Sequence, residues 1–308
     1  MFDINHILVV VDQHSPEQPA LNRALWLANA LSADLTIVSN TFDAYGDSAS
    51  TLDKVTQEAL KAAVLSHSQL WLEGLLETIN HDQVKIRSRV IWCKHAHEAV
   101  LTLVHQGNFD LVIKGTKRHT LLDRFFLHTD WNLLRHCPAP VLLVKSSEPW
   151  QRNRILASID ATSPDEGHQL INDNILSYAE HLADHFDTDL HLANAYPTIA
   201  VAFAMIPEVS APDDIQQYIT RQHDDAAEKW ARKFSVNSDH IHIGEGETEQ
   251  VIVNISKEIK ADLVVVGTVG RSGISGVLIG NTAERLVDDL DCDVLVIKPQ
   301  DGVDPTVE

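Results

Sequence analysis

Short apolar runs alternate with longer amphipathic stretches along the whole chain. The runs are rich in Val, Ile and Leu and show little polar alternation, which is typical of parallel strands covered on both faces. We predict strands at Ile7–Val11, Leu35–Asn40, Val84–Ile91, Leu111–Lys114, Val141–Val144, Ile155–Ile159, Leu190–Ala195, His240–Ile243, Leu263–Val266 and Val294–Ile297.

The stretches between these runs have the spacing of amphipathic helices, and Asp165 after Pro164 is a typical helix start. A regular alternation of strand and helix favours βαβ units built around a parallel sheet. We predict helices at Ser15–Leu31, Leu52–Ile79, Ala96–Gln106, Asp165–Phe186, Asp213–Phe234, Glu249–Lys260 and Ala283–Leu290.

Three segments of the first half recur in the same order in the second half, which indicates a tandem duplication with small insertions. A short polar linker around Pro149 separates the two copies. We therefore predict an α/β fold of two tandem Rossmann-like domains, residues 1–147 and 152–300, each with a five-stranded parallel sheet. The two domains would form a pseudo-dimer within one chain, and a homodimer of whole chains stays open. The repeated segments are Asn5–Asp12 and Asn153–Asp160, Asp110–Thr116 and Asp262–Thr268, and Val141–Lys145 and Val294–Lys298.

The composition is that of a globular protein: 44% of the 308 residues are apolar and 22% are charged, enough apolar volume for two cores. No apolar run reaches the roughly 18 residues that a membrane-spanning helix needs. The first residues lack the basic and apolar regions of a signal peptide. The three cysteines are widely spaced, so we expect reduced thiols and a cytoplasmic protein.

The net charge is divided unevenly between the two halves. Residues 1–150 hold 13 basic and 16 acidic side chains (−3), and residues 151–308 hold 11 and 28 (−17), which together give −20. Such a field repels polyanions, so we predict no general binding to nucleic acid or to an anionic membrane surface. It is compatible with a small phosphorylated ligand, because such a ligand responds to local dipoles more than to net charge.

A glycine-rich loop follows the predicted strand Leu263–Val266 and precedes the predicted helix Ala283–Leu290. Glycines let the backbone approach a ligand closely, and Asn281 and Thr282 can cap the helix, whose free N–H groups suit an anion. In a doubly wound sheet, ligands bind beyond the carboxyl ends of the strands. The loop therefore predicts a phosphate site, although it matches neither a Walker A loop nor a dinucleotide-binding loop.

The spacing Gly267-x2-Gly270-x9-Gly280, followed by a small polar residue, resembles the ATP-binding pattern of the universal stress protein family. The overall resemblance to this family covers nearly the whole chain, once in each half, and is closest to its tandem-domain members. The resemblance implies that ATP or a related nucleotide binds with its ribose and phosphates on the loop and its adenosine at the ends of the first two strands. Asn281 stands where the family has Ser or Thr, with Thr282 next. The implied site residues are Asp160, Ala195, Gly267, Thr268, Gly270, Arg271, Gly280, Asn281 and Thr282.

The corresponding loop of the first half departs from this pattern. Gly115 is retained, but Leu127 and His128 replace the last glycine and the polar residue after it. Side chains there would fill the space that a phosphate needs, so we predict a degenerate site kept for structure. An anion held by Lys117 and Arg118 is the alternative.

The 17 histidines raise the question of a metal. His95–His97 and His240–His242 have spacings that would place two ligands on one strand face, yet no second pair lies at zinc-finger distance. We interpret both pairs as surface or capping histidines, with adventitious divalent metal as the alternative. We predict no metal site, and leave open whether a metal binds His119, His128 and Asp130, which flank the altered loop.

The family resemblance implies a stress-response protein that signals or protects rather than catalyses. The loop has no Walker lysine and no clear metal carboxylate, and Arg271 is its only basic residue, so ATP hydrolysis should be slow. Two alternatives stay open: a nucleotide hydrolase, and a carrier of a phosphorylated amphiphile. The apolar stretch Tyr196–Pro207 would suit the carrier by lining an apolar pocket, unless it packs against the other half.

Overall fold

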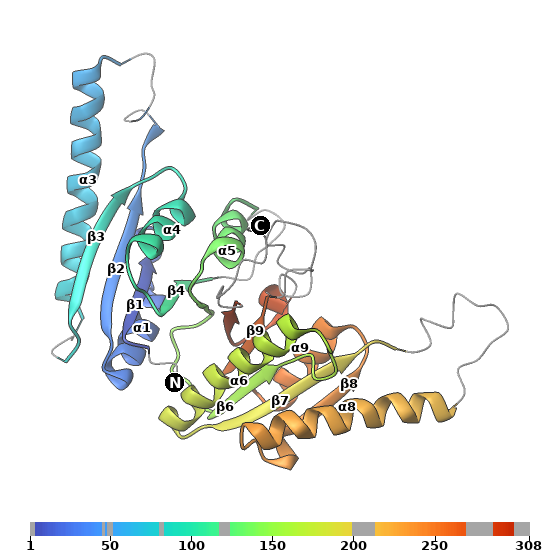
Figure 1. Ribbon diagram of the computed structural model, residues 1–308. Helices are drawn as coiled ribbons and strands as arrows, with labels where there is room; N and C mark the ends of the chain where they lie inside the picture. Colours follow the sequence, from blue (N-terminus) through green and yellow to red (C-terminus); the bar gives the residue numbers. More distant parts are fainter. Residues whose placement is uncertain are drawn as a thin grey trace, which may run out of the picture. The chain divides into compact units, whose positions relative to one another are not determined.

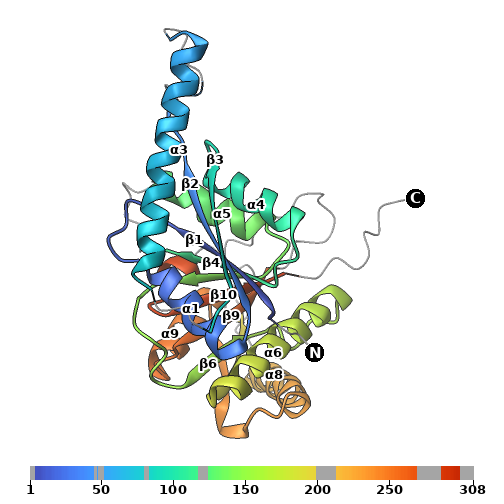
Figure 2. The same ribbon diagram turned by 90° about the vertical axis from the view of Figure 1, so that its left-hand side faces the viewer.

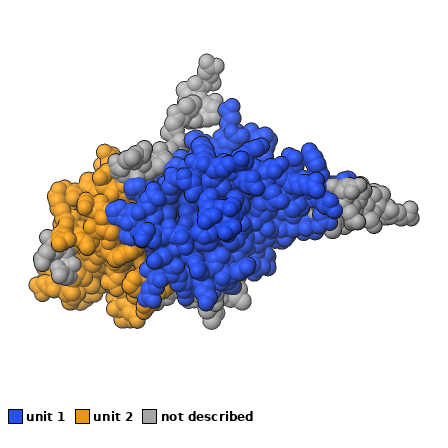
Figure 3. Space-filling model, turned by 90° about the horizontal axis from the view of Figure 1, so that it is seen from below, with its two compact units in different colours: residues 1–2, 150–308 blue, residues 3–149 orange. Residues whose placement is uncertain are grey.

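The computed structural model describes residues 4–44, 47, 52–79, 83–116, 124–198, 213–268 and 286–298. The chain divides at Trp150 into two compact units, which we call the first domain (residues 3–149) and the second domain (residues 150–308) (Figure 3). Each has its own set of paired parallel strands and its own buried apolar residues.

Strands and helices alternate through the first domain. They are β1 (His6–Val11), α1 (Pro19–Leu31), β2 (Asp34–Thr41), α3 (Lys54–Glu77), β3 (Ile86–Trp92), α4 (Ala96–Gln106), β4 (Leu111–Gly115), α5 (Arg124–His136) and β5 (Val141–Val144). The strands pair in parallel in the order β3-β2-β1-β4-β5. Helix α3 lies on one face of this sheet, and α4 and α5 lie on the other (Figures 1 and 2).

The second domain repeats this plan. Its elements are β6 (Arg154–Ser158), α6 (Glu166–Phe186), β7 (Asp189–Tyr196), α8 (Asp213–Lys233), the short 3₁₀ helix η1 (Ser238–His240), β8 (Ile241–Glu245), α9 (Thr248–Glu258), β9 (Leu263–Gly267) and β10 (Asp293–Ile297). Its strands pair in the order β8-β7-β6-β9-β10, which is the order of the first domain. Helix α6 packs on β6, β7 and β9, and both α8 and α9 pack on β7 and β8.

The predicted α/β fold with parallel strands is confirmed. Every predicted strand is present, with ends that differ by at most two residues. Ile7, Leu8 and Val9 are wholly buried, as are Val264 and Val265, and burial of consecutive residues requires that both faces of a strand be covered. No helix within the described ranges is long and apolar enough to cross a membrane.

The differences from the predicted elements have local causes. The helix predicted from Ser15 begins at Pro19, because the Gln18 side chain donates to the carbonyls of Asp12 and Ser15 at 2.6 and 2.8 Å and holds a turn there. His240, predicted in a strand, ends the turn η1, in which the Asn237 side chain accepts from the N–H of Asp239 at 3.2 Å.

Helix α5 is not among the helices named from the sequence. Among its described side chains, the buried ones are Asp130, Leu133 and Leu134, with Cys137 just after the helix, so one of the buried positions is a carboxylate. A charged residue on the buried face conceals the apolar periodicity that identifies a helix in a sequence.

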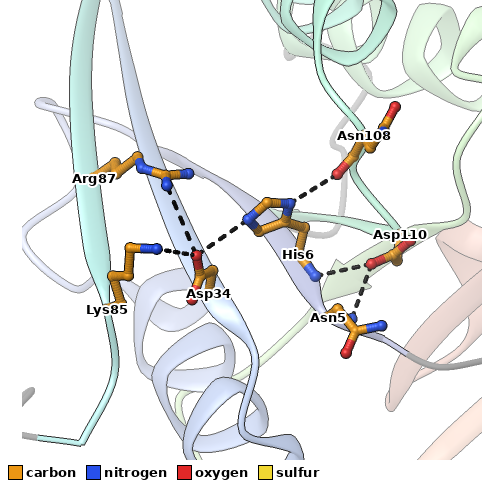
Figure 4. A network of polar contacts seen from close by, with 7 residues as sticks. All are labelled: Asn5, His6, Asp34, Lys85, Arg87, Asn108 and Asp110. Carbon is orange, nitrogen blue, oxygen red and sulfur yellow. Dashed lines mark hydrogen bonds and ion pairs between the residues drawn. The ribbon is translucent and has the colours of Figure 1, made fainter.

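An aspartate before the fourth strand of each domain holds the chain that enters the first strand. Asp110 Oδ2 accepts hydrogen bonds from the backbone N–H groups of Asn5 and His6 at 2.9 and 2.8 Å (Figure 4). In the second domain, Asp262 accepts bonds from the backbone N–H groups of Gln151, Arg152 and Arg154. This shared contact explains why both copies of the repeat carry an aspartate before the Leu-Val run.

A second carboxylate in the same region is partly exposed and pairs with exposed cations. Asp34 of β2 lies 3.0 Å from Lys85 and 3.9 Å from Arg87, and its other partner is His6 at 3.2 Å (Figure 4). The hydrogen bond from Lys85 holds the pKa of Asp34 below its usual value. Ion pairs as exposed as these contribute little to stability because water and salt screen them.

Asp110 and Asp34 allow a matched comparison of their contributions to stability. Asp110→Ala should destabilise the first domain by about 1–3 kcal/mol, because two backbone N–H groups lose a charged acceptor. Asp34→Ala should leave the free energy of unfolding nearly unchanged. Urea denaturation of the full-length protein, followed by circular dichroism, measures both, and equal effects would contradict the role assigned to Asp110.

Candidate functional site

The carboxyl ends of β6, β7 and β9 meet at one edge of the second sheet, because these strands are parallel neighbours. The strand order reverses between β6 and β9, and open α/β sheets bind ligands at such a reversal. The structure brings to this edge four residues of the site that the family resemblance implies: Asp160 beyond β6, Ala195 near the end of β7, and Gly267 and Thr268 at the end of β9.

Side chains from three elements hold the loop that follows β6. Asn172 of α6 bonds both backbone groups of Asp160: its Oδ1 accepts from the N–H at 3.2 Å and its Nδ2 donates to the carbonyl at 2.7 Å. Asn194 of β7 is wholly buried and accepts from the N–H of Ala161 at 2.9 Å. Trp230 Nε1 of α8 donates to the carbonyl of Ala161 at 3.3 Å. The loop backbone is thereby fixed, while the Asp160 side chain stays exposed.

His223 of α8 joins this network through the other end of the Asn194 amide. Because the Asn194 oxygen accepts from a backbone N–H, its Nδ2 donates to His223 Nδ1 at 2.9 Å. The His223 ring also stacks on Tyr196, with ring centroids 4.7 Å apart. Burial lowers the pKa of His223, and the acceptor role of Nδ1 works in the same direction. His223 is therefore a neutral structural partner of the loop rather than a cation for a phosphate.

The sequence pattern did not indicate the residues that hold this loop. Their contacts join positions that are 12 to 69 residues apart, which no local pattern indicates. One signal was available in α6, where Asn172 stands within the apolar face formed by Ile171 and Ile175. An amide in such a face is buried at a cost unless it has a specific partner, which here is the backbone of the β6–α6 loop.

The end of β9 is tightly packed. A Cβ atom on Gly267 would lie 2.6 Å from Ile171 Cγ1 and 2.9 Å from Ile175 Cδ1, so glycine is required here by the close approach of α6. The next residue, Thr268, is 2% exposed, and its N–H donates to the carbonyl of Ile297 at 2.9 Å. The Thr268 hydroxyl is buried without a hydrogen-bond partner in the described part of the chain.

The first domain satisfies the equivalent hydroxyl internally. Thr116 Oγ1 donates to Asp130 Oδ2 at 2.7 Å, and the other carboxylate oxygen of Asp130 pairs with Lys114 Nζ at 2.5 Å. The Asp130 side chain is 2% exposed and that of Lys114 is 17% exposed, so this is a largely desolvated ion pair. On the repeat spacings of 152 and 153, the second domain has Val266 and Ala283 at these two positions, and thus no such pair.

Several predicted residues lie outside the described ranges. They include most of the glycine loop and the residues that replace it in the first half: Gly270, Arg271, Gly280, Asn281, Thr282, Lys117, Arg118 and His119. The side chains of Leu127 and His128, and the stretch from residue 199 to Pro207, also lie outside them. Of the three residues of the first half for which metal binding was left open, Asp130 is described, and it pairs with Lys114.

Comparison with known proteins shows the family. A model described as "Universal stress protein family" matches residues 3–145 and 154–298, once in each domain. The chain belongs to the universal stress protein family. It is 33% identical over 298 residues to universal stress protein E of Escherichia coli K12, covering 96% of this chain and 94% of that relative. The resemblance to tandem-domain members is therefore confirmed, and with it membership of a stress-response family.

Solved structures agree with the tandem fold. A protein of unknown function from Pseudomonas aeruginosa PAO1 superposes on this universal stress protein with a TM-score of 0.72 and 27% identity, covering 97% of this chain and 94% of that chain. A universal stress protein from Archaeoglobus fulgidus has a TM-score of 0.63 at 15% identity, covering 98% of this chain and 99% of that chain, and shows the fold alone.

The packing of Gly267 can be tested against its counterpart in the first domain. Gly267→Ala should destabilise the second domain by about 1–3 kcal/mol, because the new Cβ overlaps two isoleucines. At Gly115 the nearest atoms to a new Cβ are 3.5 and 3.8 Å away, an ordinary contact, so Gly115→Ala should be neutral or slightly stabilising. Urea denaturation of both variants measures the change in the free energy of unfolding. A larger loss for Gly115→Ala than for Gly267→Ala would contradict the packing role of Gly267.

The ion pair of the first domain calls for a double-mutant cycle. Lys114→Val should cost about 3–5 kcal/mol, because it removes a cation that pairs with the buried Asp130 carboxylate. Adding Asp130→Ala, which gives both positions the residues of the second domain, should recover part of that loss. We expect a coupling energy of at least about 1 kcal/mol from urea denaturation. Strictly additive effects would show that the two side chains do not depend on each other.

Proposed function

We propose that this universal stress protein binds ATP or a related nucleotide in its second domain and acts in the stress response of the cytoplasm. The buried Thr268 hydroxyl carries the proposal, since it lacks a partner among the described residues and lies where β9 meets the glycine-rich segment. A buried hydroxyl without a partner costs free energy, which a ligand atom would recover. The equivalent Thr116 already has Asp130 as its partner, which supports a role of the second domain alone.

The fixed loop after β6 supports the nucleoside part of the proposal. The Asp160 carboxylate is exposed on a backbone that Asn172 holds in place, so it would accept hydrogen bonds from nucleoside hydroxyls without a cost of ordering the loop. Ala195 is partly exposed at the end of the neighbouring strand, and its small side chain would leave room for a base. By the family pattern, the phosphates would contact Gly267, Gly270, Arg271, Gly280, Asn281 and Thr282.

Binding without fast turnover fits the chemistry of these residues. Phosphoryl transfer needs charge neutralisation by metal ions and basic groups around the transferred phosphate. Arg271 is the only basic residue of the loop, and His223 is neutral and engaged with Asn194. The bound nucleotide would therefore act as a conformational ligand, with slow hydrolysis at most.

Calorimetric titration of the full-length protein with ATP tests the site. Gly270→Val and Gly280→Val should each weaken binding at least about 10-fold, because a branched side chain keeps the phosphates from the backbone N–H groups. Gly74→Ala is the matched control: nothing lies within 4 Å of a Cβ placed there in α3, so affinity should not change. Circular dichroism verifies that each variant is folded.

Two outcomes would redirect the proposal. Unchanged affinity in both valine variants would place the nucleotide elsewhere. Rapid release of phosphate from ATP by the pure protein, abolished by Arg271→Ala, would favour the hydrolase class. If ATP does not bind, mass spectrometry of small molecules released by denaturing the purified protein would identify the phosphorylated amphiphile that the carrier alternative requires.

A further inference from the structure

Three histidines and an aspartate gather at the edge of the second sheet that lies opposite the nucleotide site. Asp189 and His191 are at the amino end of β7, His240 ends η1, and His242 follows in β8. β7 and β8 are parallel neighbours, side by side in Figure 1, so their amino ends meet. We call these four residues the histidine–aspartate cluster.

The cluster has the geometry of a metal site. One ligand atom from each of Asp189, His191 and His240 lies within 4.8 Å of the others. The rings of His191 and His240 are stacked, with centroids 4.1 Å apart. Ligand atoms about 2.0–2.2 Å from a zinc ion are roughly 3.3–3.6 Å apart in a tetrahedron. Asp189 is exposed, so a rotation of its side chain would close the remaining gap.

A buried ring nitrogen of His191 also indicates a ligand at this position. His191 is 6% exposed, and its Nε2 is buried with no hydrogen-bond partner within the described residues. Its other ring nitrogen, Nδ1, lies 3.0 Å from His242 Nε2. A bond donated by Nδ1 to His242 leaves the lone pair of Nε2 free, and this is how a neighbouring acceptor orients a metal-binding histidine. A buried acceptor without a partner costs free energy, which a bound cation would return.

One permanent cation, Arg154, acts electrostatically on His191 of the cluster. The nearby Arg154 guanidinium donates to the carbonyl of Ile259 at 2.7 Å, which gives that cation a partner of its own.

The first domain provides an internal comparison. Strand registers place Asp34 at the position of Asp189 and Arg87 at the position of His240. There the carboxylate is neutralised by permanent cations, Lys85 and Arg87 (Figure 4). The second domain keeps the carboxylate but replaces the arginine by a histidine, which is neutral and can be a ligand. The same registers place Arg154 at the position of His6, so the second domain keeps one permanent cation beside the cluster, while the position of Arg87 has become a metal-binding group.

We propose that Asp189, His191 and His240 bind a zinc-class transition-metal ion, with His242 as the residue that positions His191. Two imidazoles and one carboxylate suit Zn²⁺ and its neighbours, whereas Mg²⁺ and Ca²⁺ prefer all-oxygen sites. Three protein ligands leave a coordination position open to water or to a further ligand. The site is separate from the nucleotide edge and does not depend on the proposed function.

Calorimetric titration of the metal-free full-length protein with Zn²⁺ tests the site. We expect one ion per chain, and Asp189→Asn and His240→Gln should each weaken binding at least about 10-fold. His242→Gln should weaken binding about 10-fold by releasing the orientation of His191. Co²⁺ in place of Zn²⁺ should give the visible absorption bands of a tetrahedral ion, and these bands should be lost in His240→Gln. These variants avoid the buried His191, and circular dichroism verifies their fold.

The matched control is the other histidine pair that the sequence singled out. His95 and His97 have ring centroids 5.7 Å apart, and no metal-binding group of three that includes them is found within the described residues. The double variant His95→Gln/His97→Gln should retain the full Zn²⁺ affinity. The proposal is overturned if the parent protein binds no stoichiometric Zn²⁺, or if the His95/His97 variant loses binding while His240→Gln keeps it.

Discussion

The parallel pairing of the first strand of each domain with the fourth, β1 with β4 and β6 with β9, is the contact on which the rest of each domain depends. This pairing reverses the strand order. As a result, the helices that connect the first three strands cover one face of the sheet, and the helices that connect the later strands cover the other. The pairing also sets the end of β9 beside the loop that follows β6. At the opposite edge of each sheet, Asp110 and Asp262 stabilise this pairing by accepting hydrogen bonds from the chain that enters the first strand.

Most of the fold was predictable, because burial on both faces leaves a strong mark on a sequence. A run such as Val264–Val266 must be apolar throughout, and ten such runs in a repeated order admit few topologies. The repeat added the domain plan. Helix α5 was missed for the opposite reason, since Asp130 on its buried face broke the apolar pattern that would have marked it.

The candidate site was predictable only in part. Gly267 and Asp160 follow strands, so the sheet alone brings them to one edge. The partners that make this edge rigid, such as Asn194 and Trp230, act through single contacts across the fold, and no period or spacing encodes these. The histidine–aspartate cluster shows the same limit. His240 and His242 drew attention by their spacing, but only the register of β7 against β8 adds the buried ligand His191.

The buried pair of Lys114 and Asp130 has a consequence for how the two copies diverged. Losing either residue first would remove the opposite charge from a largely desolvated side chain, so each one-step intermediate between the two arrangements is expected to be less stable than the intact pair. Because destabilised intermediates are selected against, the two arrangements do not readily interchange. Once one copy of the duplicated gene held the pair and the other did not, this structural difference between the two halves would persist in the lineage.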